Sequence, residues 1–378
     1  MLIKDCNIIY SNKIETGSIL IHNGKINKIN PTNHNETKII SGKNLYLSPG
    51  FIDVHIHGAG GYDTMDATEY AINAIARKII SHGTTSFLPT TMTMPITNIN
   101  KAIKTIKMIK DNGSEGAHVL GAHLEGPFIN SSAIGAQNPK YILEASIENY
   151  NKLVDGCEDT IISITLSPEI PGAIELIKYI SSKGIMCCLG HSHATYKEAI
   201  DAINSGASHS THLFNAMSSF NHREPGLVGA TFDSNITTEI ICDGIHVSYP
   251  ALRIAYKIKG SDNILLVSDA MMACCMKQGE YSLGGQKVFV DCDSARLKSG
   301  ALAGSILTLD KAVSNIYKNT TIPLYDIIKM VTFNPAKHCG VHNTKGLIKE
   351  GYDADLILFD ENINIKRVFI LGREIYNK

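Results

Sequence analysis

Between about Pro49 and Asn334 the chain alternates short apolar runs with longer segments of helical periodicity. Amphipathic patterns such as NINKAIKTIKMIKD and YKEAIDAINSG lie between most of the runs, and Gly184, Gly206 and Gly260 follow helical patterns where a glycine cap is expected. The eight apolar runs are FIDVHIH, TSFLPTT, VLGAHLE, IISITLS, MCCLGHS, HSTHLFN, TEIICDG and ILLVSDA. Strands that alternate with helices form a parallel sheet, and eight such units in ~250 residues predict a TIM-like (β/α)8 barrel. A doubly wound open sheet is the alternative, although no GxGxxG opens the first unit.

The two ends of the chain share a different pattern, in which apolar and polar residues alternate. Turn signals stand at Asn23-Gly24 in the first segment and at Glu350-Gly351 in the last. Neither end alone has enough strands for a stable sheet. We therefore predict one small β-sandwich domain built from residues 1–48 and 336–378, with the catalytic barrel, residues 49–335, inserted between them.

Composition excludes several classes of protein. The chain has 378 residues, 44% of them hydrophobic, and a formal net charge of −1, so nothing suggests a nucleic-acid or membrane partner. We find no run of ~18 apolar residues and no signal-peptide pattern. The nine cysteines include no CxxC pair, and the doublets Cys187-Cys188 and Cys274-Cys275 suit buried strands better than a disulfide framework. We expect a soluble protein of the reducing cytoplasm.

Polar side chains stand at the ends of the apolar runs, which is where the chemistry of such a barrel is located. The first run ends in His55 and His57, and residues two apart on a strand share a face. Later runs end in Glu125, His191, His212 and Asp269. A lone buried histidine is usually a core residue and a carboxylate often caps a helix, but such reasons would have to hold separately at five strand ends. Imidazole and carboxylate together predict a site for Zn, Fe or a similar divalent metal, with His123, His193 and His209 in support.

Several segments give the chain a resemblance to the amidohydrolase superfamily. They are PGFIDVHIHG, HLEGPF, GHSHAT, THLFNAM, REPGLVGA, DGIHV and SDAM, and GLIKEGYDADLILFD resembles the small-domain signature of the superfamily. The ordered set HLEGP, THLFNAM, REPG and DGIHV is most similar to the branch that deacetylates N-acetylglucosamine 6-phosphate. The resemblance implies metal-dependent hydrolysis of that acetamide to glucosamine 6-phosphate and acetate, in amino-sugar catabolism or cell-wall recycling.

The resemblance also implies roles for the residues at the strand ends. Glu125, His191 and His212 would bind the principal metal. His55 and His57 would bind a second one, with Glu125 as the bridge, so one or two divalent ions are expected, Zn or Fe first and Mn or Co as further options. Many relatives bridge their metals with a carboxylated lysine from the fourth strand, but SPE stands at that place in this chain.

The same resemblance assigns the acid/base role to Asp269 and substrate binding to five further positions. These are His246, the backbone N–H groups of Asn215 and Ala216 at the phosphate, Arg223 at the phosphate, and Gln137 where some relatives have histidine. In some relatives the arginine reaches across a dimer interface, so a homodimer is expected. The alternative for Arg223 is a surface ion pair with Glu224.

Two alternatives to this activity stay open. One is deacetylation of the galactosamine isomer or another amidohydrolase reaction. The other is a non-catalytic metal-binding relative, against which the presence of Asp269 argues. The segment 276–304, which is rich in glycine and strand-forming residues, is expected to form a hairpin over the mouth of the site, and Leu302 to Ser305 to line an acetyl pocket.

Overall fold

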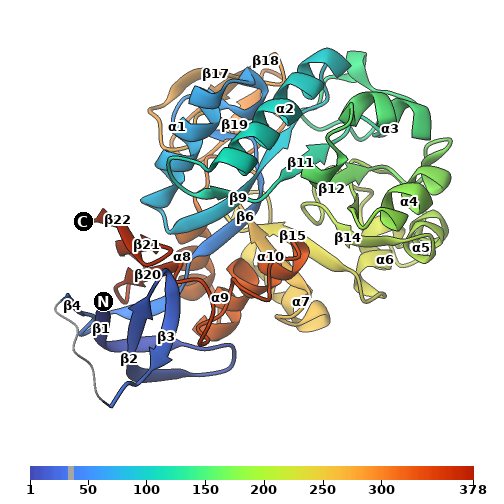
Figure 1. Cartoon of the computed structure of the whole chain (residues 1–378). Coiled ribbons are helices and arrows are strands. Elements are labelled where there is room, and N and C mark those ends of the chain that lie inside the picture. The colour runs from blue at the N-terminus through green and yellow to red at the C-terminus, as the bar shows by residue number, and fades with distance from the viewer. Residues whose placement is uncertain (33–37) are drawn as a thin grey trace.

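The alternating middle of the chain forms a nearly closed parallel barrel in the computed structural model, which describes residues 1–32 and 38–378 (Figure 1). Each of the eight apolar runs contributes one strand. The barrel strands are β6 (Phe51–Ile56), β9 (Thr84–Thr91), β11 (Ala122–Glu125), β12 (Ile161–Leu166), β13 (Met186–Leu189), β14 (Ala207–Ser210), β15 (Thr237–Ile241) and β16 (Ile264–Val267). The prediction of a TIM-like barrel is confirmed.

The first and last strands of the barrel, β6 and β16, lie next to each other. β6 pairs with β9, and the sheet continues in parallel through β11, β12, β13, β14 and β15 to β16; the short strand β10 (His118–Val119) pairs with β9. Past the end of β16, Asp269 N–H donates to the His55 carbonyl at 2.9 Å, and His57 N–H donates to the Ala270 carbonyl at 2.9 Å. These two bonds join the first and last strands at their carboxyl ends, so an open doubly wound sheet is excluded.

Helices cover the outside of the barrel (Figure 1). They are α1 (Glu69–Ile80), α2 (Ile96–Asn112), α3 (Ile147–Val154), α4 (Ala173–Ser182), α5 (Tyr196–Asn204), α6 (Gly226–Phe232), α7 (Tyr249–Lys259), α8 (Leu309–Asn319), α9 (Leu324–Val331) and α10 (Phe333–His338), with 3-10 turns η1 (Thr64–Asp66), η2 (Pro139–Tyr141) and η3 (Glu158–Thr160). In α2, Ile99, Ile103 and Ile106 are fully buried at helical spacing, which explains why this face packs on the sheet. Gly184 and Gly260 adopt φ of +78° and +67° at helix ends, as the sequence predicts.

The two ends of the chain form a second sheet beside the barrel, as predicted. Its order is β22 (Arg373–Asn377), β21 (Ile365–Ile370), β20 (Leu356–Phe359), β5 (Tyr46–Pro49), β1 (Leu2–Ile9), β2 (Ile14–His22) and β3 (Lys25–Ile29), and β4 (Ile39–Ser41) also pairs with β1. Ile3, Ile19 and Leu356 are fully buried in one core, so residues from both ends fill the same space. The bounds 1–48 and 336–378 stay a proposal: β5 and α10 run across them, and residues 33–37 lie outside the described part.

A small antiparallel sheet follows the last barrel strand. β17 (Gly279–Leu283), β18 (Gln286–Val290) and β19 (Ala295–Leu297) pair in order, and Gln286 Nε2 donates to the Ala136 carbonyl at 2.6 Å. A second small hairpin, β7 (Gly58–Ala59) with β8 (Tyr62–Asp63), follows β6. Segment 276–304 therefore forms the expected hairpin and is tied to the loop after β11.

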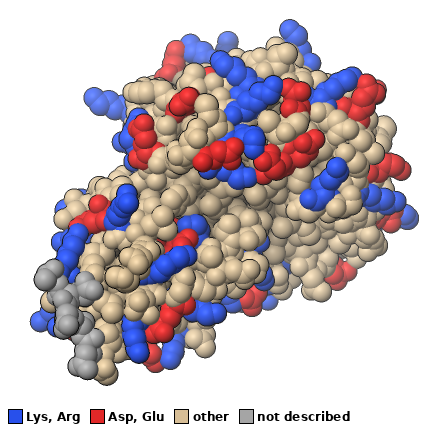
Figure 2. Space-filling view, in the orientation of Figure 1, with Lys and Arg blue, Asp and Glu red and all other residues tan. Residues whose placement is uncertain are grey.

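The surface and the cysteines complete the picture. Lys and Arg side chains are interspersed with Asp and Glu over the face in Figure 2. Within residues 1–32 and 38–378, no helix is long and apolar enough to span a membrane.

All nine cysteines are free thiols. Cys187 and Cys188 lie on β13 as expected, but the strand expected for Cys274 and Cys275 is wrong: both lie in a turn beyond β16, where Cys274 is buried by packing of the turn and not by a sheet.

Candidate metal centre and active site

Six side chains from five strand ends meet at the mouth of the barrel. His55 lies on β6 and His57 just after it, while Glu125 ends β11. His191, His212 and Asp269 follow β13, β14 and β16. Their exposed fractions run from 0% for His55 to 7% for Asp269. The structure thus brings together all the strand-end residues for which a metal or acid/base role is expected.

Glu125 stands between two pairs of histidines. Its Oε1 lies 3.1 Å from both His191 Nε2 and His212 Nε2. Its Oε2 lies 3.3 Å from His57 Nε2, and Oε1 lies 3.4 Å from His55 Nε2. Glu125 with His191 and His212, and Glu125 with His55 and His57, each place their ligand atoms close enough to hold one metal ion.

The hydrogen bonds of these rings leave the Nε2 atoms free to bind a metal. His57 Nδ1 lies 3.2 Å from the Thr90 carbonyl and His191 Nδ1 lies 3.0 Å from the Ala133 carbonyl. A carbonyl oxygen only accepts, so Nδ1 of each ring donates and the neutral ring has its lone pair on Nε2. These lone pairs aim at carboxylate oxygens, which are also acceptors. Such an arrangement needs a cation or protons at its centre, and the residues therefore fit a divalent metal.

The electrostatics of the side chains agree with that requirement. Burial lowers the pKa of His57, but hydrogen bonds and charges from Asp269 and Glu125 outweigh it and raise the pKa to about 9. Burial raises the pKa of Glu125, but His55 and His191 outweigh it and hold that pKa well below its usual range. Protons therefore occupy the cluster when no metal does, and metal binding must release them.

Asp269 lies beside the second pair of histidines. Its Oδ1 is 3.2 Å from His57 Nε2 and 3.5 Å from His55 Nε2. Burial raises the pKa of Asp269, whereas the His55 and His57 imidazoles lower it, and the result is a lowered pKa. This carboxylate is therefore charged near neutral pH and able to accept a proton.

Three residues of the cluster have unusual backbone conformations. His191, His212 and Asp269 adopt φ of +50°, +29° and +47°. Residues other than glycine avoid this left-handed region, and where the surrounding structure enforces it the position is often functional. Here each of the three residues follows the end of its strand and its side chain contacts the cluster.

A cavity of about 200 Å³ opens over the cluster. Three of the expected substrate-binding residues, Asn215, Ala216 and His246, line it, as do Leu283, Leu302 and Gly304 from the hairpin segment. His246 Nδ1 lies 2.6 Å from Asp243 Oδ2, which orients the ring. The expectation that part of Leu302 to Ser305 lines the pocket agrees with this geometry.

Gln137 also lines the cavity but contacts the cluster directly. Its Nε2 donates to Glu125 Oε2 at 2.5 Å, and its Oε1 accepts from the Thr93 backbone N–H at 2.7 Å. It is 2% exposed. The side chain therefore positions the Glu125 carboxylate and borders the cavity.

Arg223 lies outside this cavity. It is exposed in the loop between β14 and α6, and it is not among the residues that line the cavity. Glu224 does not pair with it in the described structure: Glu224 Oε1 accepts from the backbone N–H groups of Tyr196 and Gly226 at 2.7 and 3.2 Å. The structure therefore does not support the surface ion pair, and the residue is free to meet another molecule.

Three carboxylates that accept hydrogen bonds near the cluster had no role assigned to them from the sequence. Glu239 on β15 is 1% exposed and accepts from His55 Nδ1 at 2.9 Å and from His209 Nε2 at 3.2 Å. Asp53 accepts from Ser268 Oγ at 2.6 Å, and Glu169 accepts from Ser192 Oγ at 2.8 Å. A charged residue inside the apolar run TEIICDG was the available signal for Glu239.

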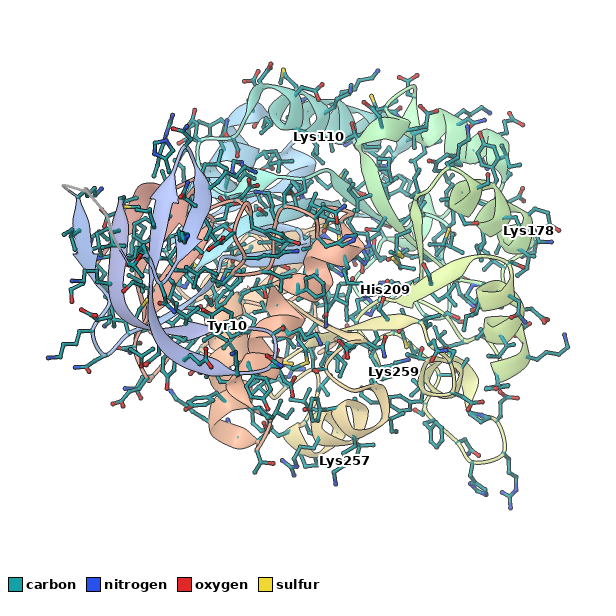
Figure 3. All side chains as sticks on the ribbon, turned by 60° about the horizontal axis from the view of Figure 1, so that its bottom comes forward. Tyr10, Lys110, Lys178, His209, Lys257 and Lys259 are labelled. Carbon is teal, nitrogen blue, oxygen red and sulfur yellow. The ribbon has the colours of Figure 1, made fainter. Side chains whose placement is uncertain are left out.

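Of the three histidines expected to support the cluster, His123 and His209 lie in the barrel beside it, whereas the partners of His193 lie outside it. His209 is enclosed by the barrel strands (Figure 3) and is fully buried. His123 Nε2 lies 2.8 Å from Thr165 Oγ1, and its ring packs edge-on against His55 with centroids 4.6 Å apart. Exposed His193 lies 3.1 Å from Ser132 Oγ through Nδ1.

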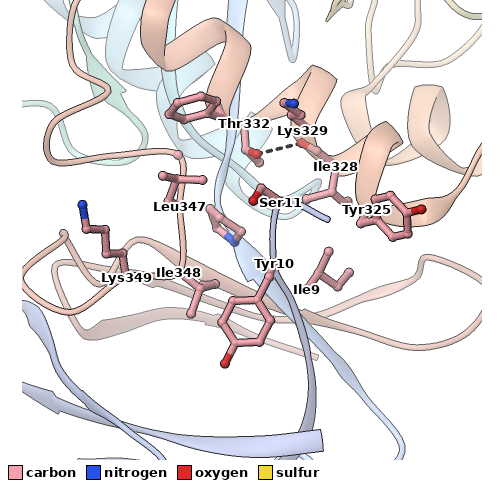
Figure 4. A pocket seen from close by; sticks show the side chains of 13 residues that line it. Ile9, Tyr10, Ser11, Tyr325, Ile328, Lys329, Thr332, Leu347, Ile348 and Lys349 are labelled. Atoms are coloured by element: carbon pink, nitrogen blue, oxygen red, sulfur yellow. Dashed lines mark hydrogen bonds between the residues drawn. The ribbon is translucent and has the colours of Figure 1, made fainter. Parts of the chain in front are cut away.

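A second pocket of about 220 Å³ lies where the sheet built from both chain ends meets α9 (Figure 4). Tyr10, Tyr325, Lys329 and Lys349 are among its lining residues. Among the described residues that line it there is no histidine, cysteine or carboxylate, so it lacks the metal-ligand types that line the cavity at the barrel mouth.

Known proteins are similar to this chain in both sequence and fold. Residues 46–375 match the amidohydrolase family. The chain is 38% identical over 376 residues to the N-acetylglucosamine-6-phosphate deacetylase of Lysinibacillus sphaericus, covering 99% of this chain and 97% of the relative. It is 35% identical over 328 residues to the N-acetylgalactosamine-6-phosphate deacetylase of Escherichia coli O157:H7, covering 86% and 87%. The crystal structure of N-acetylglucosamine-6-phosphate deacetylase from Pasteurella multocida matches with a TM-score of 0.95 at 32% identity, over 100% of this chain and 99% of that one.

Proposed function

The chain belongs to the amidohydrolase family, and from that premise we propose that it hydrolyses the acetamide of N-acetyl-D-glucosamine 6-phosphate to D-glucosamine 6-phosphate and acetate. The observation that supports this most is the convergence of four histidine Nε2 atoms on Glu125, with Asp269 beside them, under a cavity of about 200 Å³. Such a constellation suits attack of water on an unreactive amide.

The histidines and Glu125 hold the metal in this proposal. Glu125, His191 and His212 form the principal site, and His55 and His57 form a second site that shares Glu125. A divalent ion bound there supplies Lewis acidity, which lowers the pKa of water toward ~7 and polarises a carbonyl group. Zn or Fe is proposed first because imidazole and carboxylate ligands suit both, with Mn and Co as alternatives.

Asp269 transfers the proton. Its carboxylate, which the lowered pKa keeps ionised, accepts the proton of the attacking water and then returns that proton to the nitrogen of the leaving amine. Protonation of the nitrogen is needed because an amide anion is a very poor leaving group. His57 Nε2 lies 3.2 Å from Asp269 Oδ1, so the carboxylate stands beside the second metal position in this proposal.

The cavity walls position the sugar. His246 is oriented by Asp243, and its protonated imidazole stabilises the negative charge that develops on the carbonyl oxygen of the substrate. The backbone N–H groups of Asn215 and Ala216 meet the phosphate, while Gln137 fixes Glu125 and borders the sugar. Arg223 is exposed and lies outside the cavity of its own chain. In a homodimer it binds the phosphate of the substrate held by the neighbouring subunit.

The galactosamine isomer is the second candidate substrate. The E. coli O157:H7 relative is named for that isomer and is 35% identical to this chain. A non-catalytic metal-binding role is less well supported, because Asp269 stands at the centre with a lowered pKa. We also propose that the enzyme acts in the cytoplasm, where phosphorylated amino sugars are metabolised.

Acetate release with purified protein tests this function. We expect strong chelation to abolish hydrolysis and Zn, Fe, Mn or Co to restore it, with faster turnover of the glucosamine compound than of its galactosamine isomer. Glu125→Gln should lose more bound metal than His55→Asn, because Glu125 contributes to both sites. Full activity in exhaustively metal-free protein, or bound metal without any acetate release, would contradict the proposal.

A further inference from the structure

A cysteine, a histidine and an aspartate form a hydrogen-bonded chain away from the metal centre. Cys275 Sγ lies 3.3 Å from His82 Nε2, and His82 Nδ1 lies 3.1 and 3.2 Å from the two carboxylate oxygens of Asp310. Asp310 is itself fixed, because Thr308 Oγ1 and the Lys311 backbone N–H donate to it at 2.5 and 2.9 Å. The three residues come from the turn beyond β16, the end of α1 and the start of α8.

This arrangement holds a thiolate beside an imidazolium. The adjacent Cys274 thiol, whose Sγ is 3.7 Å away, and the His82 ring lower the pKa of Cys275 to about 5. Burial lowers the pKa of His82, but Asp310 and Cys275 outweigh it and raise that pKa to about 10. Thiolates with a cationic partner and partial access to solvent are the reactive cysteines of proteins.

The other cysteines differ from Cys275 in burial or in charge. Cys6, Cys157, Cys187, Cys188, Cys242, Cys274 and Cys339 are buried. Cys292 is exposed, but a hydrogen bond to Asp293 raises the pKa of its thiol. Cys275 is half-buried, so among the nine it alone combines solvent access with a stabilised thiolate. The amide hydrolysis proposed above does not use it.

We propose that Cys275 is a nucleophilic thiol that forms mixed disulfides with small disulfides, assisted by His82 and Asp310. The Cys275 thiolate attacks one sulfur of the small disulfide, the new Sγ–S bond forms as the old S–S bond breaks, and a small thiolate leaves and takes a proton from solvent. His82 fixes the thiolate before attack, and Asp310 holds the imidazole in orientation. No other oxidant is required.

The pH dependence of thiol modification tests this site in the metal-loaded enzyme. Dithiodipyridine is the probe, and peptide mass spectrometry gives a separate rate for each cysteine. For Cys275, already ionised, we expect less than about a twofold change between about pH 6 and pH 8. Exposed Cys292 is the internal control, and an ordinary thiol of pKa ~8.5 should react roughly 80-fold faster at the higher pH.

Two variants separate the paired site from chance exposure. His82→Gln removes the cation, so the rate at Cys275 should become as steeply pH-dependent as that at Cys292. His22→Gln is the matched control, because His22 is exposed on β2 and should leave the profile flat. The proposal is overturned by a steep profile at Cys275 in the wild type, by no reaction there while Cys292 reacts, or by an unchanged flat profile in His82→Gln. Since the wild-type profile needs no substitution, a folding defect in a variant does not rescue it.

Discussion

Glu239→Gln is the substitution that most directly tests how the barrel orients its metal ligands. The buried carboxylate accepts through Oε2 from His55 Nδ1 at 2.9 Å and from the His212 backbone N–H at 3.2 Å, and through Oε1 from His209 Nε2 at 3.2 Å. Glutamine has the same shape but offers one oxygen and one donor group. Its oxygen can retain the bonds to His55 and His212, and its NH₂ then faces His209.

The expected loss follows from charge, because the geometry survives. His209 can switch tautomer, so that its Nε2 accepts from the new NH₂ and its Nδ1 donates to Thr237 Oγ1, which lies 2.7 Å away and is able to accept as well as donate. What disappears is the negative charge of the acceptor, which turns a charge-assisted bond to the His55 imidazole into a neutral bond of roughly half the strength. Changes in the partners of metal ligands typically weaken metal binding roughly tenfold to hundredfold, and we expect a loss at the lower end of that range.

Competition with a chelator measures this affinity, and acetate release measures turnover. We expect the weakening to be greatest for the ion held by His55 and His57, because Glu239 contacts the His55 side chain but only the backbone of His212. Glu148→Gln is the control, since Glu148 is on the surface of α3 and pairs with Lys152. Metal affinity in Glu239→Gln within twofold of the wild type, with an unchanged melting temperature, would refute the reasoning.

Three further outcomes are expected. Asp269→Asn should keep its metal and bind substrate, but lose at least ~100-fold in kcat, and near-normal turnover would move the proton transfer to another residue. Arg223→Ala should raise KM for the phosphorylated sugar roughly tenfold to hundredfold and barely change the slow hydrolysis of N-acetylglucosamine. Equal losses on both sugars would rule out phosphate binding by Arg223. If the arginine reaches across the dimer, hybrid dimers of Asp269→Asn and Arg223→Ala subunits should regain activity. The pKa of His57 in the folded apoprotein is about 9, above the ~6.5 of an unfolded chain, so its proton stabilises the apoprotein below about pH 6.5 and this stabilisation is lost as the pH rises through 9. Melting curves of metal-free protein should therefore show a larger fall in Tm toward about pH 9 for the wild type than for His57→Asn, and an equal fall in both would contradict that assignment.

Much of the fold could be read from the chain because its elements are marked locally. The run ILLV is fully buried as β16 and ends two residues before Asp269, so the period of hydrophobic residues and the position of the polar one both survive in the structure. Cys274-Cys275 misled the same reasoning. An apolar doublet reads as a buried strand, yet its burial comes from a turn that packs near residues far away in sequence, such as His82.

The site divides in the same way. His55, His57, Glu125, His191, His212 and Asp269 were found from sequence because strand ends of a parallel barrel must meet, so residue type and position suffice. The roles of Glu239 and Glu169 were not found, because they depend on which atoms lie within hydrogen-bonding distance across neighbouring strands. Gln137 was expected at the substrate, whereas its amide also donates to the Glu125 carboxylate.

The sequence by itself determined the barrel, the second sheet from the two chain ends and the set of residues at the metal centre, since each rests on periodicity or on the order of strands. Only the tertiary structure decided which nitrogen of each histidine faces the metal position, where Arg223 stands relative to the cavity, and that Cys275 meets His82 and Asp310. Those features depend on distances of about 3 Å between residues far apart in the chain, such as the 3.3 Å from Cys275 Sγ to His82 Nε2. Hydrogen bonding and ion pairing change steeply over such distances, and no local pattern of residue types specifies them.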